Sequence, residues 1–185
     1  YWDPSDSDSY PGSGTTYNNL SLSNPDLRIF NGITYDSSTP SHFKCDGVDD
    51  YIGPSTWGYG MADPFYVDMS KPFTIGLWYR LPITSTSTII CSLQTEDWGW
   101  PRVVTQGLAF YISSKRQLLR LDEVGQFMIG NQDDVCVDTW HFGAITYDNE
   151  YYRIWHNGTL DGESKARSYS AHNLYIGRAK ISEGQ

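Results

Sequence analysis

The chain has 185 residues, enough for one domain with a sizeable core. Thirteen basic residues against 22 acidic ones give a net charge of −9, which argues against a nucleic-acid partner because neutralising phosphates requires clustered Lys and Arg. A hydrophobic content of 39% is typical of a globular protein. No apolar run approaches the roughly 20 residues of a membrane-spanning helix, so membrane insertion is not expected.

Residues 1–25 differ in composition from the rest of the chain. They are rich in Asp, Ser, Gly, Pro and Asn and carry few aliphatic side chains, so they cannot form a core of their own. We therefore expect an extended N-terminal arm or linker at residues 1–25 and one domain at residues 26–185. Large rings are costly to leave in water, so we expect an oligomer or a larger assembly with the arm or the strand edge at the contact, the alternative being an arm that folds back on its own sheet. These rings are Tyr1, Trp2, Tyr10 and Tyr17.

Short alternating runs separated by turn residues follow the arm. Residues 73–81 read FTIGLWYRL, which puts five apolar side chains on one strand face at period two and Trp78 on the opposite face. Residues 107–112 and 117–121 are joined by a short polar link and predict a hairpin.

A second hairpin is predicted in the last third of the chain. Residues 140–147 and 151–156 have the composition of strands, and the Asn157-Gly158 pair that follows suits a type I′ turn, which needs positive φ at both positions. Residues 174–177 predict a late strand. Many short strands with regular turns, and no amphipathic helix longer than two turns, predict an antiparallel sandwich or barrel.

The cysteines are Cys45, Cys91 and Cys136. An odd number with wide spacing is not a disulfide framework, and cysteine packs as a small hydrophobe. We therefore expect three buried free thiols, which suits assembly in a reducing cytosol.

Five segments carry a family resemblance by their order. They are residues 45–52 (CDGVDDYI), 72–78 (PFTIGLW), 140–148 (WHFGAITYD), 153–158 (RIWHNG) and 174–178 (LYIGR). In this order they resemble the motifs of concanavalin A-like lectin/glucanase domains, specifically laminin-G-like jelly rolls, over roughly residues 28–180. The resemblance implies an all-β fold, an antiparallel β-sandwich of the concanavalin A-like jelly-roll type, here with the extended N-terminal arm. Such domains usually add a closing strand after the last motif, whereas this chain ends at Gln185, so an open sheet edge is expected.

The glucanase relatives need two carboxylates on one strand face, in a Glu-x-Asp-x-x-Glu pattern. That pattern is absent, and no two of the five glutamates are close in sequence. We therefore expect no catalytic residues and predict that the chain is not an enzyme. The alternative is a polysaccharide-degrading glycoside hydrolase whose carboxylates are brought together by the fold.

Three acids of one turn are candidate calcium ligands, because hard cations take clustered carboxylates. They are Asp46, Asp49 and Asp50. An Asp before Gly also favours a tight turn, and Asp side chains accept hydrogen bonds from nearby backbone amides. Turn chemistry is the preferred interpretation, so we expect no metal and no other cofactor, and folding without calcium.

Two Gly-rich loops carry aromatic residues, at residues 56–60 (TWGYG) and 96–102 (EDWGWPR). Exposed rings beside acids suit sugar stacking or a protein interface, although the rings can instead fold back over the core. The predicted ligand-binding residues are Trp57, Tyr59, Trp98, Trp100 and Asp97.

Residues 9–17 (SYPGSGTTY) resemble the segment that precedes such domains in tailed-phage structural proteins. This resemblance implies a non-catalytic structural or adhesion module on the virion surface, as capsid decoration, fibre or tail component, with weak glycan binding. Its partners would be other virion proteins or copies of itself, and a cell-surface glycan, after assembly in the host cytoplasm. A free-standing carbohydrate-binding lectin domain of a bacterial surface protein is a further alternative.

Overall fold

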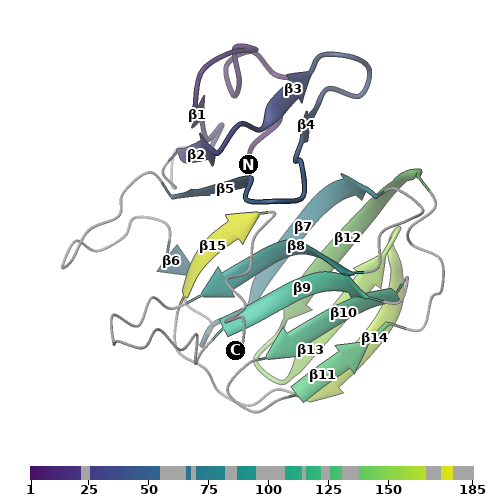
Figure 1. Ribbon diagram of the computed structural model, residues 1–185. Helices are drawn as coiled ribbons and strands as arrows, with labels where there is room; N and C mark the ends of the chain where they lie inside the picture. Colours follow the sequence, from purple (N-terminus) through teal and green to yellow (C-terminus); the bar gives the residue numbers. More distant parts are fainter. Residues whose placement is uncertain are drawn as a thin grey trace, which may run out of the picture.

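The computed structural model describes residues 1–21, 26–54, 66–67, 70–81, 87–94, 107–113, 116–121, 126–130, 138–165 and 172–176. Every regular element in these ranges is a β-strand, and all recorded strand pairs are antiparallel. The described part contains no helix long and apolar enough to cross a membrane. Figure 1 shows two larger sheets facing each other, with the N-terminal strands at one end.

The larger sheet has nine strands. Its order is β1 (Thr16–Tyr17), β2 (Leu27–Phe30), β5 (Tyr51–Pro54), β15 (His172–Ile176), β8 (Ser87–Gln94), β9 (Gly107–Ser113), β10 (Arg116–Leu121) and β11 (Gln126–Ile129), with β6 (Tyr66–Val67) pairing with β15. The hairpin predicted around residue 114 is confirmed as β9 and β10. The late predicted strand is β15, which lies between β5 and β8 rather than at an edge.

The second sheet has four strands. Its order is β14 (Thr159–Lys165), β13 (Tyr151–His156), β12 (Trp140–Tyr147) and β7 (Phe73–Arg80). Along β7 the side chains alternate between exposed and at least partly buried, which confirms the predicted period of two. The β13–β14 turn has φ of 49° at Asn157 and 83° at Gly158, so the predicted positive φ at both positions is confirmed.

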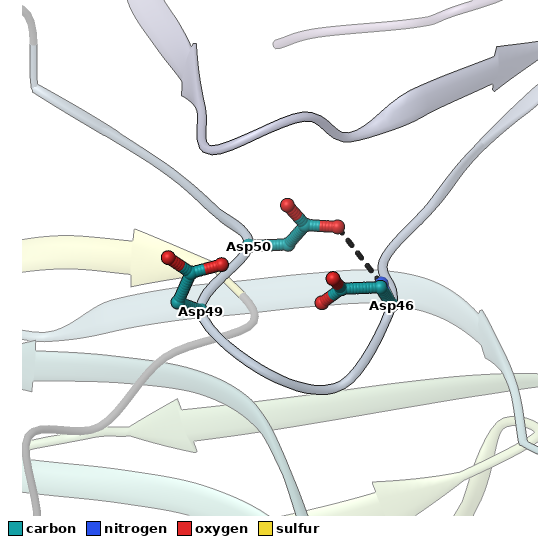
Figure 2. A group of neighbouring side chains, drawn as sticks. All are labelled: Asp46, Asp49 and Asp50. Carbon is teal, nitrogen blue, oxygen red and sulfur yellow. Dashed lines mark hydrogen bonds between the residues drawn. The ribbon is translucent and has the colours of Figure 1, made fainter.

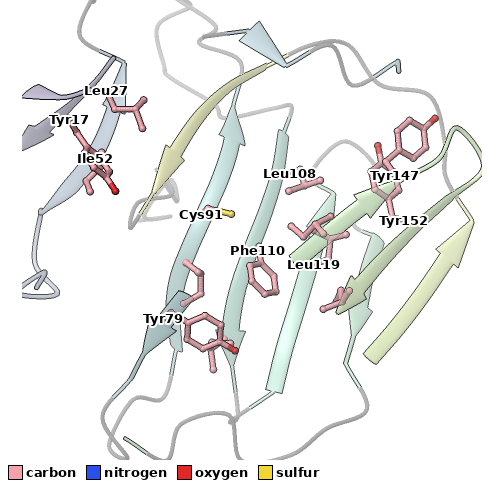
Figure 3. Packing of buried hydrophobic residues seen from close by; sticks show 14 of the residues in the cluster. Tyr17, Leu27, Ile52, Tyr79, Cys91, Leu108, Phe110, Leu119, Tyr147 and Tyr152 are labelled. Atoms are coloured by element: carbon pink, nitrogen blue, oxygen red, sulfur yellow. The ribbon is translucent and has the colours of Figure 1, made fainter. Parts of the chain in front are cut away.

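The inner faces of the two sheets meet in one hydrophobic core, part of which is shown in Figure 3. Phe110 of β9 is fully buried and lies against Gly143 of β12, where an added methyl group would come within 2.9 Å of the Phe110 ring. Ile145 and Ile154 are also fully buried on the four-stranded sheet. Two antiparallel sheets packed through their apolar faces confirm the predicted β-sandwich.

The N-terminal arm closes on its own chain. Its strand β1 pairs with β2, and Tyr10 and Tyr17 are buried against a two-stranded sheet of β3 (Thr34–Asp36) and β4 (His42–Lys44). The Phe43 ring centroid lies 4.9 Å from that of Tyr10 and 5.0 Å from that of Tyr17. The described residues thus show the alternative, an arm that folds back on its own chain, while the expected assembly stays a prediction.

The cysteines differ from one another in burial. Cys91 is a buried free thiol, as predicted. Cys45 is free but exposed, so its predicted burial is wrong: it follows β4 at the start of the acidic turn instead of facing the core. Cys136 lies outside the described residues.

Candidate functional site

The outward face of the four-stranded sheet carries a row of apolar side chains. Trp78 of β7 is 65% exposed, and its ring centroid lies 5.4 Å from that of Phe142, its register partner on β12. Trp155 of β13 lies on the same outward face of the sheet, and its register partner Leu160 on β14 is 46% exposed. We call these residues the outer row: Trp78, Phe142, Trp155 and Leu160.

Neighbouring residues hold two rings of the outer row in place. A Cβ atom at Gly76 would lie 2.8 Å from Cζ of Phe142, so the glycine lets the Phe142 ring lie against the backbone of β7. The Trp155 indole donates a hydrogen bond from Nε1 to Oγ1 of Thr146, at 2.9 Å. Rings that are fixed before a ligand arrives lose little entropy on binding.

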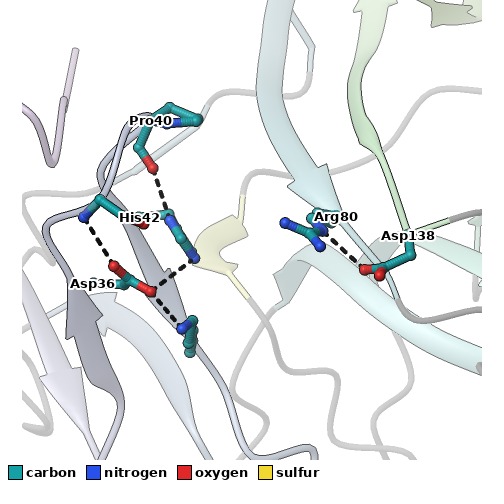
Figure 4. A network of polar contacts seen from close by, with 7 residues as sticks. Asp36, Pro40, His42, Arg80 and Asp138 are labelled. Atoms are coloured by element: carbon teal, nitrogen blue, oxygen red, sulfur yellow. Dashed lines mark hydrogen bonds and ion pairs between the residues drawn. The ribbon is translucent and has the colours of Figure 1, made fainter.

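Ion pairs flank the outer row. Arg80, two residues after Trp78 on the same strand face, donates to Asp138 at 2.8 Å (Figure 4). Arg153, two residues before Trp155, donates from Nη1 to Asp148 and from Nε to Glu163, each at 2.5 Å. The hydrogen bond from Arg153 is the main reason why the pKa of Asp148 is lowered to about 2. The row is therefore apolar in its centre and rich in hydrogen-bonding groups at its margins.

A pair of histidines lies inside the sandwich, apart from the outer row. His141 of β12 and His156 of β13 are buried, with Nδ1 of His141 2.8 Å from Nε2 of His156. Burial lowers the pKa of both imidazoles, and the neighbouring His156 lowers that of His141 further, whereas Asp161 opposes the shift at His156. With exposed fractions of only 7% and 6%, these rings have little surface to offer a ligand.

Gln117 of β10 extends this buried group from the opposite sheet. Its amide donates a hydrogen bond to the Tyr79 hydroxyl at 2.8 Å, and the Tyr79 ring stacks on that of His141 with centroids 5.7 Å apart. Among the described residues, Oε1 of Gln117 has no hydrogen-bond partner. Polar contacts thus link the two sheets at this level of the core, where an apolar contact would be the usual arrangement.

The acidic turn brings its three carboxylates together, as Figure 2 shows. One oxygen from each of Asp46, Asp49 and Asp50 lies within 4.8 Å of the others. The Asp46 amide donates to Oδ2 of Asp50 and the Val48 amide donates to Oδ1 of Asp46, each at 2.8 Å, which is the turn chemistry expected from the sequence. Oδ1 of the buried Asp50 has no hydrogen-bond partner among the described residues, so a hard cation and a self-sufficient turn both fit this geometry.

We expect that removing calcium leaves the melting temperature unchanged, because backbone amides already satisfy oxygens of Asp46 and Asp50. Thermal melts in excess chelator and in excess calcium chloride measure this directly. A marked fall in melting temperature on chelation, absent in an Asp49→Asn variant, would show instead that the three carboxylates hold a structural cation.

None of the ligand-binding residues predicted from the sequence lies in the described part of the chain. Trp57, Tyr59, Trp98, Trp100 and Asp97 therefore remain predictions. The outer row was not predicted as a site, although one signal pointed to it. Period-two alternation had placed Trp78 on the face of its strand opposite the apolar one, and a large ring on that face is exposed when the strand packs on a core.

No family model and no curated protein matches the chain. Solved structures similar to it include domains LG4-5 of the mouse laminin alpha1 chain, with 14% identity and a TM-score of 0.47 over 64% of this chain and 31% of that one. The carbohydrate-binding module CBM66 from Bacillus subtilis has 13% identity and a TM-score of 0.45, over 81% and 86%. The alginate lyase AlgAT5, of polysaccharide lyase family 7, has 14% identity and a TM-score of 0.45, over 92% of this chain and 72% of that one. The chain thus spans about a third of the length of the laminin chain. The assignment of the β-sandwich depends on the two sheets described above.

The sequence-based prediction excluded enzymatic activity, and that prediction is wrong. Alginate lyases, among them one from Corynebacterium sp., are similar to between 89% and 92% of this chain. The prediction rested on a missing carboxylate pair, which glycoside hydrolysis requires. General acid–base catalysis is also carried out by His, Tyr and Lys side chains, so a missing pair of carboxylates does not exclude catalysis.

Proposed function

We propose that the chain is a carbohydrate-binding jelly-roll module that holds a glycan on the outer row. The observation that carries this proposal is the exposure of Trp78, continued across the sheet by Phe142, Trp155 and Leu160. A pyranose ring has apolar C–H faces that pack on aromatic rings, while its hydroxyl groups reach polar side chains at the margin. Two of the rings are already fixed by Gly76 and Thr146, which favours binding of a flat ligand.

We further propose that this module acts at the surface of a virion, as a decoration, fibre or tail component in contact with other virion proteins or with copies of itself. The support is the segment at residues 9–17, which resembles the leader of tailed-phage structural proteins. Labelling of purified virions with an antibody to this chain tests the location. Particles that contain the chain only internally, or not at all, would contradict it.

Replacing Trp78 by Ala is expected to weaken glycan binding at least about tenfold, because truncation of a central ring in such a surface costs on the order of 2 kcal/mol or more. Affinity electrophoresis in gels containing single polysaccharides measures the loss. Tyr1→Ala is the matched control, since Tyr1 is 67% exposed but lies in the arm, away from the outer row.

A Trp98→Ala variant separates the two candidate sites. Binding that survives Trp78→Ala but is lost in Trp98→Ala would assign the glycan to the predicted loop residues instead of the outer row. The same polysaccharides, tested for shortened chains after incubation with the wild-type protein, show whether binding is accompanied by cleavage.

A further inference from the structure

Each tryptophan of the outer row has an arginine two residues away on the same strand. Arg80 follows Trp78 on β7, and Arg153 precedes Trp155 on β13. Residues two apart on a strand share one face, so both guanidinium groups border the surface that would hold the sugar. An arginine in this position is the usual means of recognising a carboxylate-bearing ligand, because its planar fork matches the carboxylate geometry.

Both of these arginines are already bound to carboxylates of the chain. Arg80 uses Nε for Asp138, while Arg153 uses Nη1 for Asp148 and Nε for Glu163 and lies over the Tyr151 ring, 5.3 Å from its centroid. The hydrogen bonds from arginine lower the pKa of Asp138 and Asp148, so these acids stay ionised at neutral and mildly acidic pH. The third cation recorded on this face, Lys165, lies 3.9 Å from Glu150.

The electrostatic potential of the carboxylates on this face disfavours binding of an acidic glycan. Its carboxylate would have to approach each arginine beside a carboxylate of the chain that is already paired with it, and the two negative charges would repel each other. The chain as a whole carries a net charge of −9, which adds long-range repulsion of polyanions. An uncharged pyranose meets neither obstacle and can still accept hydrogen bonds from the same arginines.

We infer that the outer row selects uncharged glycans and rejects acidic ones, with Asp138, Asp148 and Glu163 as the specificity-determining residues because their charges neutralise Arg80 and Arg153. This inference rests on the proposed function and commits it to one class of ligand. It also assigns the ion pairs a role beyond stability, to which exposed pairs of this kind contribute little.

The test compares the wild-type protein with Asp138→Asn on an array of neutral and uronate- or sialate-bearing glycans. Within the described residues, Asp138 is the carboxylate paired with Arg80, and its φ of 58° lies in the left-handed region, which Asn tolerates as well as Asp does. The substitution therefore removes the negative charge beside Arg80 without straining the backbone. Glu163→Gln does the same beside Arg153, and Asp8→Asn, at an exposed position in the arm, removes the same charge far from the outer row.

The wild-type protein is expected to bind neutral glycans only, with little dependence on salt. Asp138→Asn and Glu163→Gln should gain acidic ligands at least about tenfold, a gain that rising ionic strength removes, whereas Asp8→Asn should gain none. Tighter wild-type binding of acidic than of neutral glycans would overturn the inference and leave the proposed function intact, as would equal gains in all three variants. No binding of any glycan would overturn the proposed function itself.

Discussion

Phe110→Ala is expected to lower the free energy of unfolding by about 3–5 kcal/mol, the usual range for truncating a buried aromatic side chain. The Phe110 side chain is fully buried and fills the space above Gly143, which has no side chain of its own to replace it. The flanking strands β9 and β12 are held by backbone pairing on both sides, so the structure around the cavity cannot easily collapse. Equilibrium denaturation with an unchanged m value measures the loss.

Trp78→Ala is the matched control for this experiment. It also removes an aromatic ring from a strand, but that ring lies on the exposed face, where most substitutions change stability by about 0.5 kcal/mol or less. Its contact with Phe142 makes a loss of up to about 1 kcal/mol reasonable. If Phe110→Ala costs no more than Trp78→Ala, the assignment of the inner and outer faces is incorrect.

Local pattern was enough to predict three strands of the four-stranded sheet, β7, β12 and β13, and the turn that leads into the fourth. Alternation marked β7, and the Asn157-Gly158 signal fixed the turn between β13 and β14, because both depend on residues that are close in sequence. The placement of β15 between β5 and β8 depends on contacts between residues far apart in the chain, for which a single sequence carries no local signal. The arm shows the same division: its rings predicted docking, but not that Phe43 would receive them.

The outer row was missed for a related reason. The sequence showed that Trp78 faces away from the core, but not that Phe142 would be its register partner, 64 positions later in the chain. Register between β12 and β13 then adds Trp155 to the same face. A single exposed ring is common on proteins, whereas several rings across adjacent strands form a surface suited to a ligand. Only the strand pairing distinguishes the two cases.

The unfolding free energy is expected to fall as the pH drops from about 7 to 5, because of the buried histidine pair. Nδ1 of His141 and Nε2 of His156 lie 2.8 Å apart, a hydrogen-bond distance for two neutral imidazoles, and protonation of either ring would place a charge in the core near Tyr79 and Gln117. Both pKa values are lowered in the folded chain, chiefly by burial. The unfolded chain takes up protons near pH 6.5, before the folded chain does, so protons favour unfolding in this range.

The expected slope is at most about 1.4 kcal/mol per pH unit for each histidine, between its unfolded and folded pKa values. Denaturant titrations at a series of pH values measure it. The ion-paired acids lose their contribution at lower pH, since the pKa of Asp148 is about 2, which leaves the interval above pH 5 to the histidines. His156→Gln should flatten the slope in that interval, whereas His42→Gln, on the separate hairpin of β3 and β4, should not. A stability that is constant or rises toward pH 5 in the wild-type protein would show that the folded chain takes up protons at this pair at least as readily as the unfolded chain does, against the lowered pKa values.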